Sequence, residues 1–488
     1  MNLTSATNIA QSALSTVSAE SAVVSRNISG VNSPSFSQKV ANVITTFDGG
    51  SEVVSVTNAQ NQALFGNVLG ATSASATQAA ISNGLISLLN IVGQPGSDTS
   101  PAEKLSDLTN AIQQYQASPS SSSLAEAAVT AAQNLASTLN NATNTVQQVR
   151  EQADSQMASS VASINSLLTQ FQSVNQQIVT GTAMGSDVTN LQDTRNSILT
   201  QLSQQVGITT TTNSSGDMSI YTDSGVALFQ GGTASSVTFQ PTQTYTAGTT
   251  GNAVYIDGIP VTGSSSSMPI QTGALAGLAT LRDNVTVTYQ TQLDQTANGL
   301  INAFAETDPT NSSNTLAGLF TDSGSTALPT ASQVPGLAGN ITVNAAVNPS
   351  QGGDPTKLGN GINFNFNTSN QASFGTQLEK YLTGLSATQS FSSAGGIGTS
   401  NTLAGYAAAS VSWLDAEQQN VKSESAYQST LLSTSTTALS NATGVNLDDE
   451  MSQMLDLENS YSASAKLLTT ISNMFAALTN AINQATPA

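Results

Sequence analysis

Two apolar stripes with helical spacing, one at each end of this 488-residue chain, constrain its fold more than any other feature. The first stripe follows a seven-residue repeat and comprises Leu3, Ala10, Leu14, Val17, Val24, Ile28 and Val31. The second alternates strictly between steps of three and four and comprises Met454, Leu457, Tyr461, Ser464, Leu468, Ile471, Phe475, Leu478 and Ile482. Such spacing places one side chain per turn on a single helix face, as in a coiled-coil seam.

An isolated amphipathic helix gains little stability in water unless another surface covers its apolar face. We therefore expect the two terminal helices to pack on each other or on neighbouring subunits. Chain termini usually fray, so apolar seams at both ends indicate an assembly device. We define the terminal seam as the residues of both stripes without Val31 and Ser464, and predict that it forms the assembly site.

The rest of the pattern predicts an α+β, multidomain fold. A long helical bundle and coiled-coil core is built from both chain ends, and β-rich domains are inserted into it. We expect the first helix to end at Ser29-Gly30, with Pro34 preventing its continuation. A weakly alternating segment around Asp48-Gly49-Gly50 predicts a hairpin, and glycines, Pro95 and a serine-rich stretch at 118–123 interrupt the helices that follow.

The predicted domains follow these changes of period. They are a terminal helix and extended segment (1–60), a helical domain (61–206), a β-rich insertion (207–272), a helical return (273–306), a β-rich and loop-rich outer domain (307–397), a long helix of the helical domain (398–445) and a C-terminal coiled-coil helix (446–488).

Composition excludes several classes of function. The chain carries 29 acidic and 10 basic residues, a net charge of −19, which disfavours binding to nucleic acid or to an anionic membrane surface. It contains neither cysteine nor histidine, so disulfides, thiol nucleophiles and Cys/His zinc sites are impossible. The start at Met1-Asn2 shows no secretory signal pattern, and Leu85–Val92 is too short to span a bilayer. We expect a soluble chain that, if exported, uses no cleaved signal.

The candidate chemical groups favour structural explanations. The chain has no phosphate-binding loop, calcium loop or helical metal pair, and no cofactor or metal site is predicted. We interpret Asp448-Asp449-Glu450 as first-turn acids of a helix that Asn446 caps, rather than as a cation site. Asp283 and Asp294 could be cast as an acid–base pair, but a solvated helical face is the expected setting for both.

Two terminal motifs carry a resemblance to a known family. Residues 443–451 (TGVNLDDEM) and 461–468 (YSASAKLL) resemble the C-terminal signature of bacterial flagellar axial proteins, and residues 27–37 resemble their N-terminal signature. Two interior helices, at 190–202 and 273–294, are similar to those of the hook–filament junction proteins, the hook-associated protein 1 or FlgK family.

The resemblance implies a non-enzymatic, extracellular component of the flagellum. Subunits of that family are exported by the flagellar type III pathway and assemble as a ring-like layer between hook and filament. The implied partners are further copies of the chain, the hook protein, the next hook-associated protein on the filament side, and an export chaperone at the C-terminal helix. No nucleic acid and no membrane insertion are expected.

Other classes of protein stay open at this point. A flagellin or hook-like subunit is the nearest structural alternative, although the helices at 73–205 argue against a hook protein. A secreted adhesin carried by the β insertions is a second alternative, because their Ser/Thr/Gly-rich composition is common in solvent-facing domains. A carboxylate-dependent hydrolase is a third, disfavoured by the lack of a recognisable set of catalytic groups.

Overall fold

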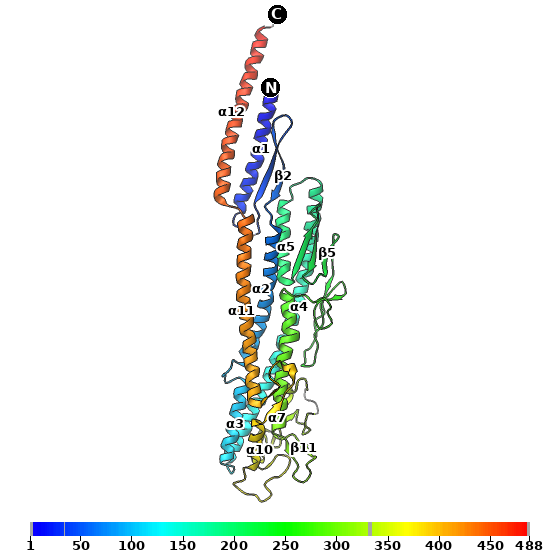
Figure 1. Ribbon diagram of the computed structural model, residues 1–488, viewed down its shortest axis with the longest axis vertical. Coiled ribbons are helices and arrows are strands. Elements are labelled where there is room, and N and C mark those ends of the chain that lie inside the picture. The colour runs from blue at the N-terminus through cyan, green and yellow to red at the C-terminus, as the bar shows by residue number, and fades with distance from the viewer. Residues whose placement is uncertain (1–2, 34, 330–333, 486–488) are drawn as a thin grey trace.

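We describe the protein from a computed structural model in which residues 3–33, 35–329 and 334–485 are described. Met1, Asn2 and Pro34, on which parts of the sequence argument depend, lie outside these residues. The molecule is a long rod with both ends of the chain near one pole (Figure 1). It combines long helices with several small sheets, so the expected α+β class is confirmed. The division into domains stays a prediction.

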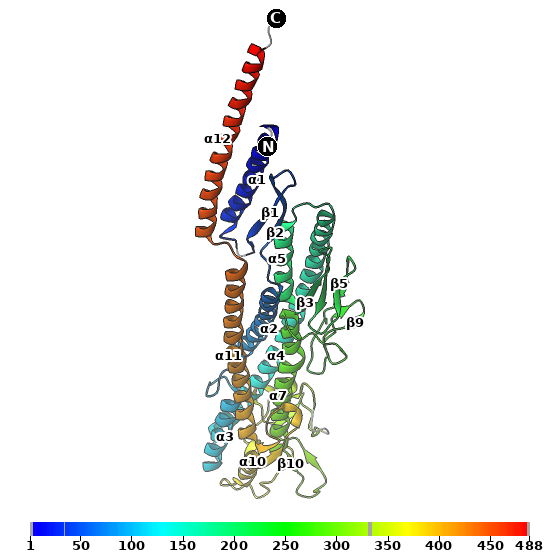
Figure 2. The ribbon, with the colours of Figure 1, turned by 45° about the horizontal axis from the view of Figure 1, so that its top comes forward.

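The terminal pole contains two helices and a hairpin. The predicted first helix is α1 (Leu3–Gly30), and the C-terminal helix is α12 (Leu447–Ala485). They lie side by side and run in opposite directions (Figures 1 and 2). The predicted hairpin is also confirmed: β1 (Lys39–Thr45) pairs antiparallel with β2 (Ser51–Asn58), with a bulge after Asn42. Gly49, in the turn, has a φ of 84°, which glycine adopts without strain.

Five long helices form the body of the rod. They are α2 (Gln62–Val92), α3 (Pro101–Ala117), α4 (Ser122–Ala183), α5 (Thr189–Gln205) and α11 (Leu403–Thr443). Side chains cap four of their N-termini: Asn61, Ser100, Ser121 and Thr402 each accept a backbone N–H from the first turn. The interruptions predicted near Pro95 and at 118–123 are confirmed, whereas α4 continues through Gly181 and ends at Ala183.

The core of the body is one continuous hydrophobic cluster. The apolar positions of α4 recur at helical spacing and are all buried: Leu135, Leu139, Val146, Val149, Met157, Val161, Ile164, Leu168 and Phe171. The helices approach closely where glycine replaces a larger residue. A Cβ atom on Gly277 would lie 2.5 Å from the carbonyl oxygen of Thr77 in α2, so no larger side chain fits there.

The first β-rich insertion packs on α4. Its strands form a four-stranded sheet, β3-β4-β5-β6, and a three-stranded sheet, β7-β8-β9. The strands are β3 (Ile208–Thr212), β4 (Met218–Thr222), β5 (Ala227–Gln230), β6 (Thr233–Ala234), β7 (Val237–Thr238), β8 (Tyr255–Ile256) and β9 (Ile259–Pro260). Phe229 of β5 contacts Phe171 of α4 edge to face, with ring centroids 4.9 Å apart. This contact joins the sheet to the core of the rod.

The chain then returns to the body through three helical segments. They are α6 (Ala274–Thr280), the π-helical turn η1 (Leu281–Val285) and α7 (Thr286–Ala303). The predicted return to helix after the insertion is confirmed as far as Ala303, and Glu306 already belongs to a strand; periodicity did not predict the π turn. Extra residues of this kind inside a helix often mark sites with special requirements, and this turn carries the fully buried Arg282.

The second insertion consists of short elements around α7 at the opposite pole. They are β10 (Glu306–Thr307), β11 (Thr315–Leu316), β12 (Phe320–Asp322), α8 (Leu337–Asn340), β13 (Ile341–Val343), η2 (Pro349–Gln351), α9 (Lys357–Asn360), α10 (Thr376–Ser386), β14 (Thr388–Ser390), η3 (Ser393–Gly395) and β15 (Ser400–Thr402).

Candidate functional site: the terminal helix pair

The helix pair α1–α12 brings the two sequence stripes together. Val17 and Val24 of α1 and Leu457 of α12 form a buried cluster of their own, against which Ile28 and Met454 pack. Ala10 and Ile471 are also buried, and Leu3, Leu14 and Leu468 are half-buried. Full burial of a Val or Leu side chain stabilises a fold by about 1.5–3 kcal/mol. These residues of the terminal seam therefore form a closed packing interface within one chain.

The rest of the terminal seam is open. Its exposed members lie on α12, with exposed fractions of 51% for Tyr461, 37% for Phe475, 53% for Leu478 and 56% for Ile482. For Phe475, Leu478 and Ile482 the reason is length, because α12 has 39 residues and α1 has 28, so the C-terminal turns of α12 extend beyond α1 (Figure 1). The chain itself thus covers most of the seam, and these C-terminal members face solvent.

Further exposed apolar side chains lie at this pole, outside the sequence-derived seam. On α12 they are Met451, Leu455, Leu467 and Met474, and on the hairpin they are Val40, Val43, Ile44, Phe47 and Val54. A single seven-residue stripe could not identify them, because they flank the stripe or belong to strands. Soluble monomers rarely expose so many large apolar residues in one region, and such regions usually mark contact with another protein.

A polar cluster closes the base of the helix pair. Asn27 of α1 exchanges two hydrogen bonds with the backbone of Lys39, at 2.9 and 2.8 Å. Its side-chain amide also donates to Glu450 of α12 at 3.0 Å, and Gln38 donates to the same carboxylate oxygen at 2.8 Å. The two signature motifs, 423 residues apart in sequence, therefore meet in one hydrogen-bonded cluster.

This cluster corrects our interpretation of the acidic triplet. The amide of Asp448 donates to Asn446, as a capped helix requires. Glu450, however, is not a solvated first-turn acid: only 1% of it is exposed, and its partners come from α1 and the start of β1. Sequence alone could not reveal this, because a carboxylate three residues inside a helix has an equally good solvated setting.

A second polar layer joins the pole to the body. Lys39 forms a buried ion pair with Asp193 of α5. The same carboxylate accepts hydrogen bonds from Ser37 at 2.6 Å and from Asn58 at 3.2 Å. Burial lowers the pKa of Lys39, and Asp193 opposes that shift. Because the N-terminal signature runs directly into this layer, it fixes the terminal helices on the rod.

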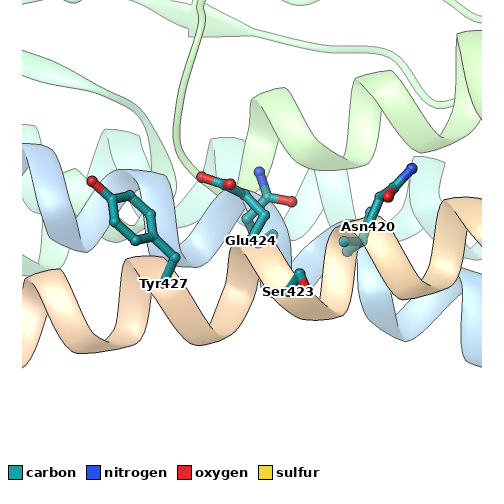
Figure 3. Close-up of a pocket in the computed structure, with 6 residues that line it drawn as sticks. Asn420, Ser423, Glu424 and Tyr427 are labelled. Carbon is teal, nitrogen blue, oxygen red and sulfur yellow. The ribbon is translucent and has the colours of Figure 1, made fainter.

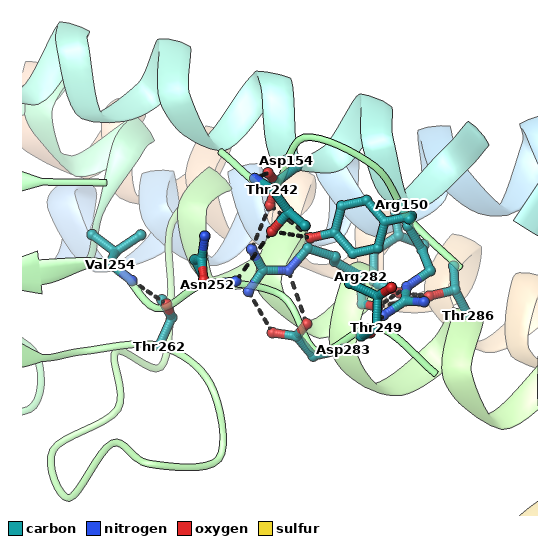
Figure 4. Close-up of polar contacts among 12 residues, drawn as sticks. Arg150, Asp154, Thr242, Thr249, Asn252, Val254, Thr262, Arg282, Asp283 and Thr286 are labelled. Atoms are coloured by element: carbon teal, nitrogen blue, oxygen red, sulfur yellow. Dashed lines mark hydrogen bonds and ion pairs between the residues drawn. The ribbon is translucent and has the colours of Figure 1, made fainter. Parts of the chain in front are cut away.

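A separate buried cluster fastens the first β insertion to α4. Arg282 of the π turn donates to Asp154 of α4 at 2.6 Å and to Asp283 at 2.7 and 2.8 Å (Figure 4). Asp154 also accepts from Tyr245 of the insertion at 2.9 Å. Burial alone would lower the pKa of Arg282, but the two neighbouring carboxylates raise it. The cluster stays charged and holds three segments together.

These contacts show that the solvated setting expected for Asp283 and Asp294 is wrong. Both carboxylate oxygens of Asp283 accept hydrogen bonds from Arg282. Asp294 is 4% exposed and accepts hydrogen bonds from the backbone N–H groups of Gly336 and Ala338, each at 2.9 Å. Both partners of Asp294 lie more than forty residues along the chain, beyond the reach of helical periodicity. Neither residue lies in an open site where it could act on a substrate.

Burial raises the pKa of Asp294 to about 6, in spite of hydrogen bonds from Ala338, Gly336 and Gln290. Because the native pKa lies above the unfolded value, protonation favours the folded state, and this contribution is lost as pH rises through 6. We expect the unfolding free energy of the wild-type chain to gain about 2–3 kcal/mol relative to Asp294→Asn between pH 7.5 and pH 4. Urea unfolding of both chains at several pH values measures the difference, and a constant difference would contradict the assignment.

A shallow groove of about 560 Å³ lies between α2 and α11 (Figure 3). Its lining is Gln78, Asn420, Val421, Ser423, Glu424 and Tyr427. Glu424 accepts from Gln428 of its own helix. Within the described ranges, no three acidic side chains are placed to hold a metal ion, and no helix is long and apolar enough to cross a membrane.

Comparison with known proteins matches two parts of the chain to models of flagellar protein families. A family model described as the flagellar hook-associated protein FlgK helical domain matches residues 87–312, and one described as the flagellar basal body rod FlgEFG protein C-terminal matches residues 438–481. The second match contains most of α12 and all of the terminal seam on that helix except Ile482.

Individual relatives are similar over a shorter stretch. Flagellar hook-associated protein 1 of Escherichia coli (strain K12) is 32% identical over 155 residues, and that of Salmonella typhimurium is 30% identical over 152 residues. Each match covers 31% of this chain and only 26% of the relative.

A solved structure described as the flagellar hook junction protein FlgK from Burkholderia pseudomallei is 22% identical, with a TM-score of 0.41. That match covers 52% of this chain and 46% of the other. The helical-domain model and the curated relatives both point to the FlgK family of flagellar hook-associated proteins, to which the chain is similar over the matched residues.

Proposed function

We propose that the chain is a structural subunit of the bacterial flagellum, located outside the cell at the junction between hook and filament. Similarity to the FlgK helical domain supports this role, and so do the names of the relatives, which are hook-associated proteins. The matched segments cover only part of those relatives, so their full set of partners comes to this chain as a proposal. No catalytic role is part of it.

The observation that carries the proposal is the half-open terminal seam. A helix whose exposed face carries Phe475, Leu478 and Ile482 is suited to pack against another helix of the same kind. In this function, the terminal helices of adjacent copies form the inner coiled-coil layer of a ring, the body helices form a middle layer, and the β insertions face outward. The hook protein lies below the ring and the next hook-associated protein lies above it.

Export and protection of the seam belong to the same proposal. The flagellar type III pathway passes unfolded chains, and a chain without cysteine cannot be trapped by disulfides on the way. Before export, a chaperone would cover the apolar face of α12, which otherwise exposes Leu467, Met474 and Leu478 to solvent. The chain needs no cleaved signal on this route.

Deletion of the gene in the source bacterium tests the function. We expect cells that assemble hooks but retain no filaments, lose swimming motility and release flagellin monomers into the medium. Electron microscopy of isolated hooks and immunoblots of the culture supernatant measure both effects, and expression from a plasmid should restore filaments. Deletion cells with normal filaments on their hooks would contradict the proposal.

A further inference from the structure

The hairpin β1–β2 presents an apolar face that no other described residue of the chain covers. We define the hairpin face as Val40, Ile44, Phe47 and Val54, all exposed, with Phe47 fully exposed near the turn. The opposite face lies on α1, where Thr16 donates to the backbone of Ser51 at 2.7 Å. Exposed aromatic side chains are common anchors of protein interfaces, and a two-stranded hairpin is marginally stable alone.

A second apolar face lies on the C-terminal half of α12. We define the α12 face as Leu467, Met474, Phe475, Leu478 and Ile482, all exposed. It is different in residues and shape from the hairpin face. Two different apolar surfaces on one chain can pack on each other between copies arranged head to tail, and this arrangement generates a ring or a helix of subunits.

The positions of the two faces suit such an arrangement. In both views α1 lies between the hairpin and α12 (Figures 1 and 2). The hairpin is level with Ser12 and Thr16 of α1, which bond to Ser51. Counting along the antiparallel helices from the contact between Asn27 and Glu450 places Lys466 opposite Gln11, next to Ser12. The hairpin and the start of the α12 face are therefore at one height, on opposite sides of α1.

Charge complements this geometry. In a chain with a net charge of −19, the segment 459–485 carries a single charged residue, the exposed Lys466. The hairpin carries the exposed acids Asp48 and Glu52, and Glu52 lies directly across from Ile44 of the hairpin face. Acidic copies repel one another over most of their surface, whereas Lys466, which directly precedes Leu467 at the edge of the α12 face, attracts the acids of the hairpin.

We propose that the hairpin face of one copy packs on the α12 face of the next copy, with Glu52 beside Lys466. The inference rests on the proposed function and names the surfaces through which neighbouring subunits join. Each copy then contacts the start of the α12 face of one neighbour with its hairpin face, and offers its own α12 face to the other. One repeated contact thus covers Phe47 of the hairpin and Leu467 of α12, both of which are exposed in the single chain.

Cross-linking in isolated flagella tests the contact. The chain has no cysteine, so the double variant Glu52→Cys and Lys466→Cys carries the only thiols. Because a disulfide requires Cα atoms within about 7 Å, a mild oxidant should convert this variant into a ladder of multimers. The matched control pairs Lys466→Cys with Met184→Cys, an equally exposed position at the end of α4, and should yield no ladder.

Charge reversal provides a second test on the same strains. We expect Glu52→Lys and Lys466→Glu each to lower the number of filaments retained per cell several-fold, because the contact becomes repulsive. The two changes combined in one chain, or the two variants expressed together, should restore filaments. We expect Phe47→Ser to reduce filament retention at least about tenfold, whereas Met184→Ser should have no effect.

The outcomes separate this inference from the function. Filaments retained on hooks, together with cross-links no stronger than in the control pair and no rescue by the combined reversal, would overturn the contact and leave the junction role standing. Loss of filaments on Phe47→Ser without charge rescue or cross-links would place a different partner on the hairpin, and would also overturn it. If the unmodified chain is absent from isolated flagella, both the proposed function and the proposed contact are wrong.

Discussion

A chain that ends after Gly444 should be exported and folded but unable to hold a filament. The truncation removes α12, and with it every exposed member of the terminal seam. The hydrophobic cluster of the body contains no residue of α12, so we expect its main thermal unfolding transition to be unchanged. The helix α1 loses its packing partner and should become sensitive to protease, because an isolated helix is marginal in water.

Three measurements decide this prediction. Immunoblots of the culture supernatant show whether the truncated chain leaves the cell, calorimetry follows the body, and electron microscopy counts filaments on hooks. A chain that ends after Gln484 retains Ile482 and serves as the control, which should behave as the full chain. Filaments retained by cells that carry only the shorter chain would show that the seam is not the assembly site.

Replacing Asp154 by alanine should destabilise the rod by about 3–5 kcal/mol, the usual cost of breaking a buried ion pair from one side. The change removes a carboxylate from the fully buried Arg282 and leaves the Tyr245 hydroxyl without its acceptor at 2.9 Å. Since Tyr245 belongs to the first β insertion, we expect the insertion to detach before the body unfolds. Urea unfolding and protease cleavage within 236–272 measure the two effects.

The exposed pair Lys104–Asp107 provides the matched control. It has a similar N–O distance, 2.9 Å, but more than half of the Asp107 side chain is exposed. Exposed pairs contribute only about 0–1 kcal/mol, so Asp107→Ala should be nearly neutral. If the two variants had equal unfolding free energies, the buried cluster would not hold the insertion.

Hydrophobic periodicity was sufficient to predict a helix or strand wherever one side of that element faces a continuous core. The helical domain predicted at 61–206 contains α4, whose apolar residues from Leu135 to Phe171 are all buried, and the predicted interruptions lie within a few residues of the ends of the neighbouring helices. The alternation around Asp48-Gly49-Gly50 predicted the hairpin because turn chemistry is local. These features depend on residues close together in sequence.

Buried polar groups could not be predicted in this way. Glu450 and Asp294 look like ordinary solvated acids of a helix until Asn27 and Ala338, far away in the chain, are placed beside them. The terminal seam was predicted as one interface, yet Val24 and Phe475 differ in exposure because α12 is longer than its partner. Relative length and long-range pairing are properties of the folded chain that no local pattern contains.

The contact between Asn27 and Glu450 has a consequence for the order of folding. It closes a loop of more than four hundred residues, and such distant contacts form late because the chain must first bring their ends together. The body does so by placing the end of α11 beside the start of β1, where Gln38 donates to the carbonyl of Thr443 at 2.8 Å. The mating end of the molecule is therefore completed last, and only by a chain that has arrived in full. An unfinished chain lacks the α1–α12 helix pair altogether.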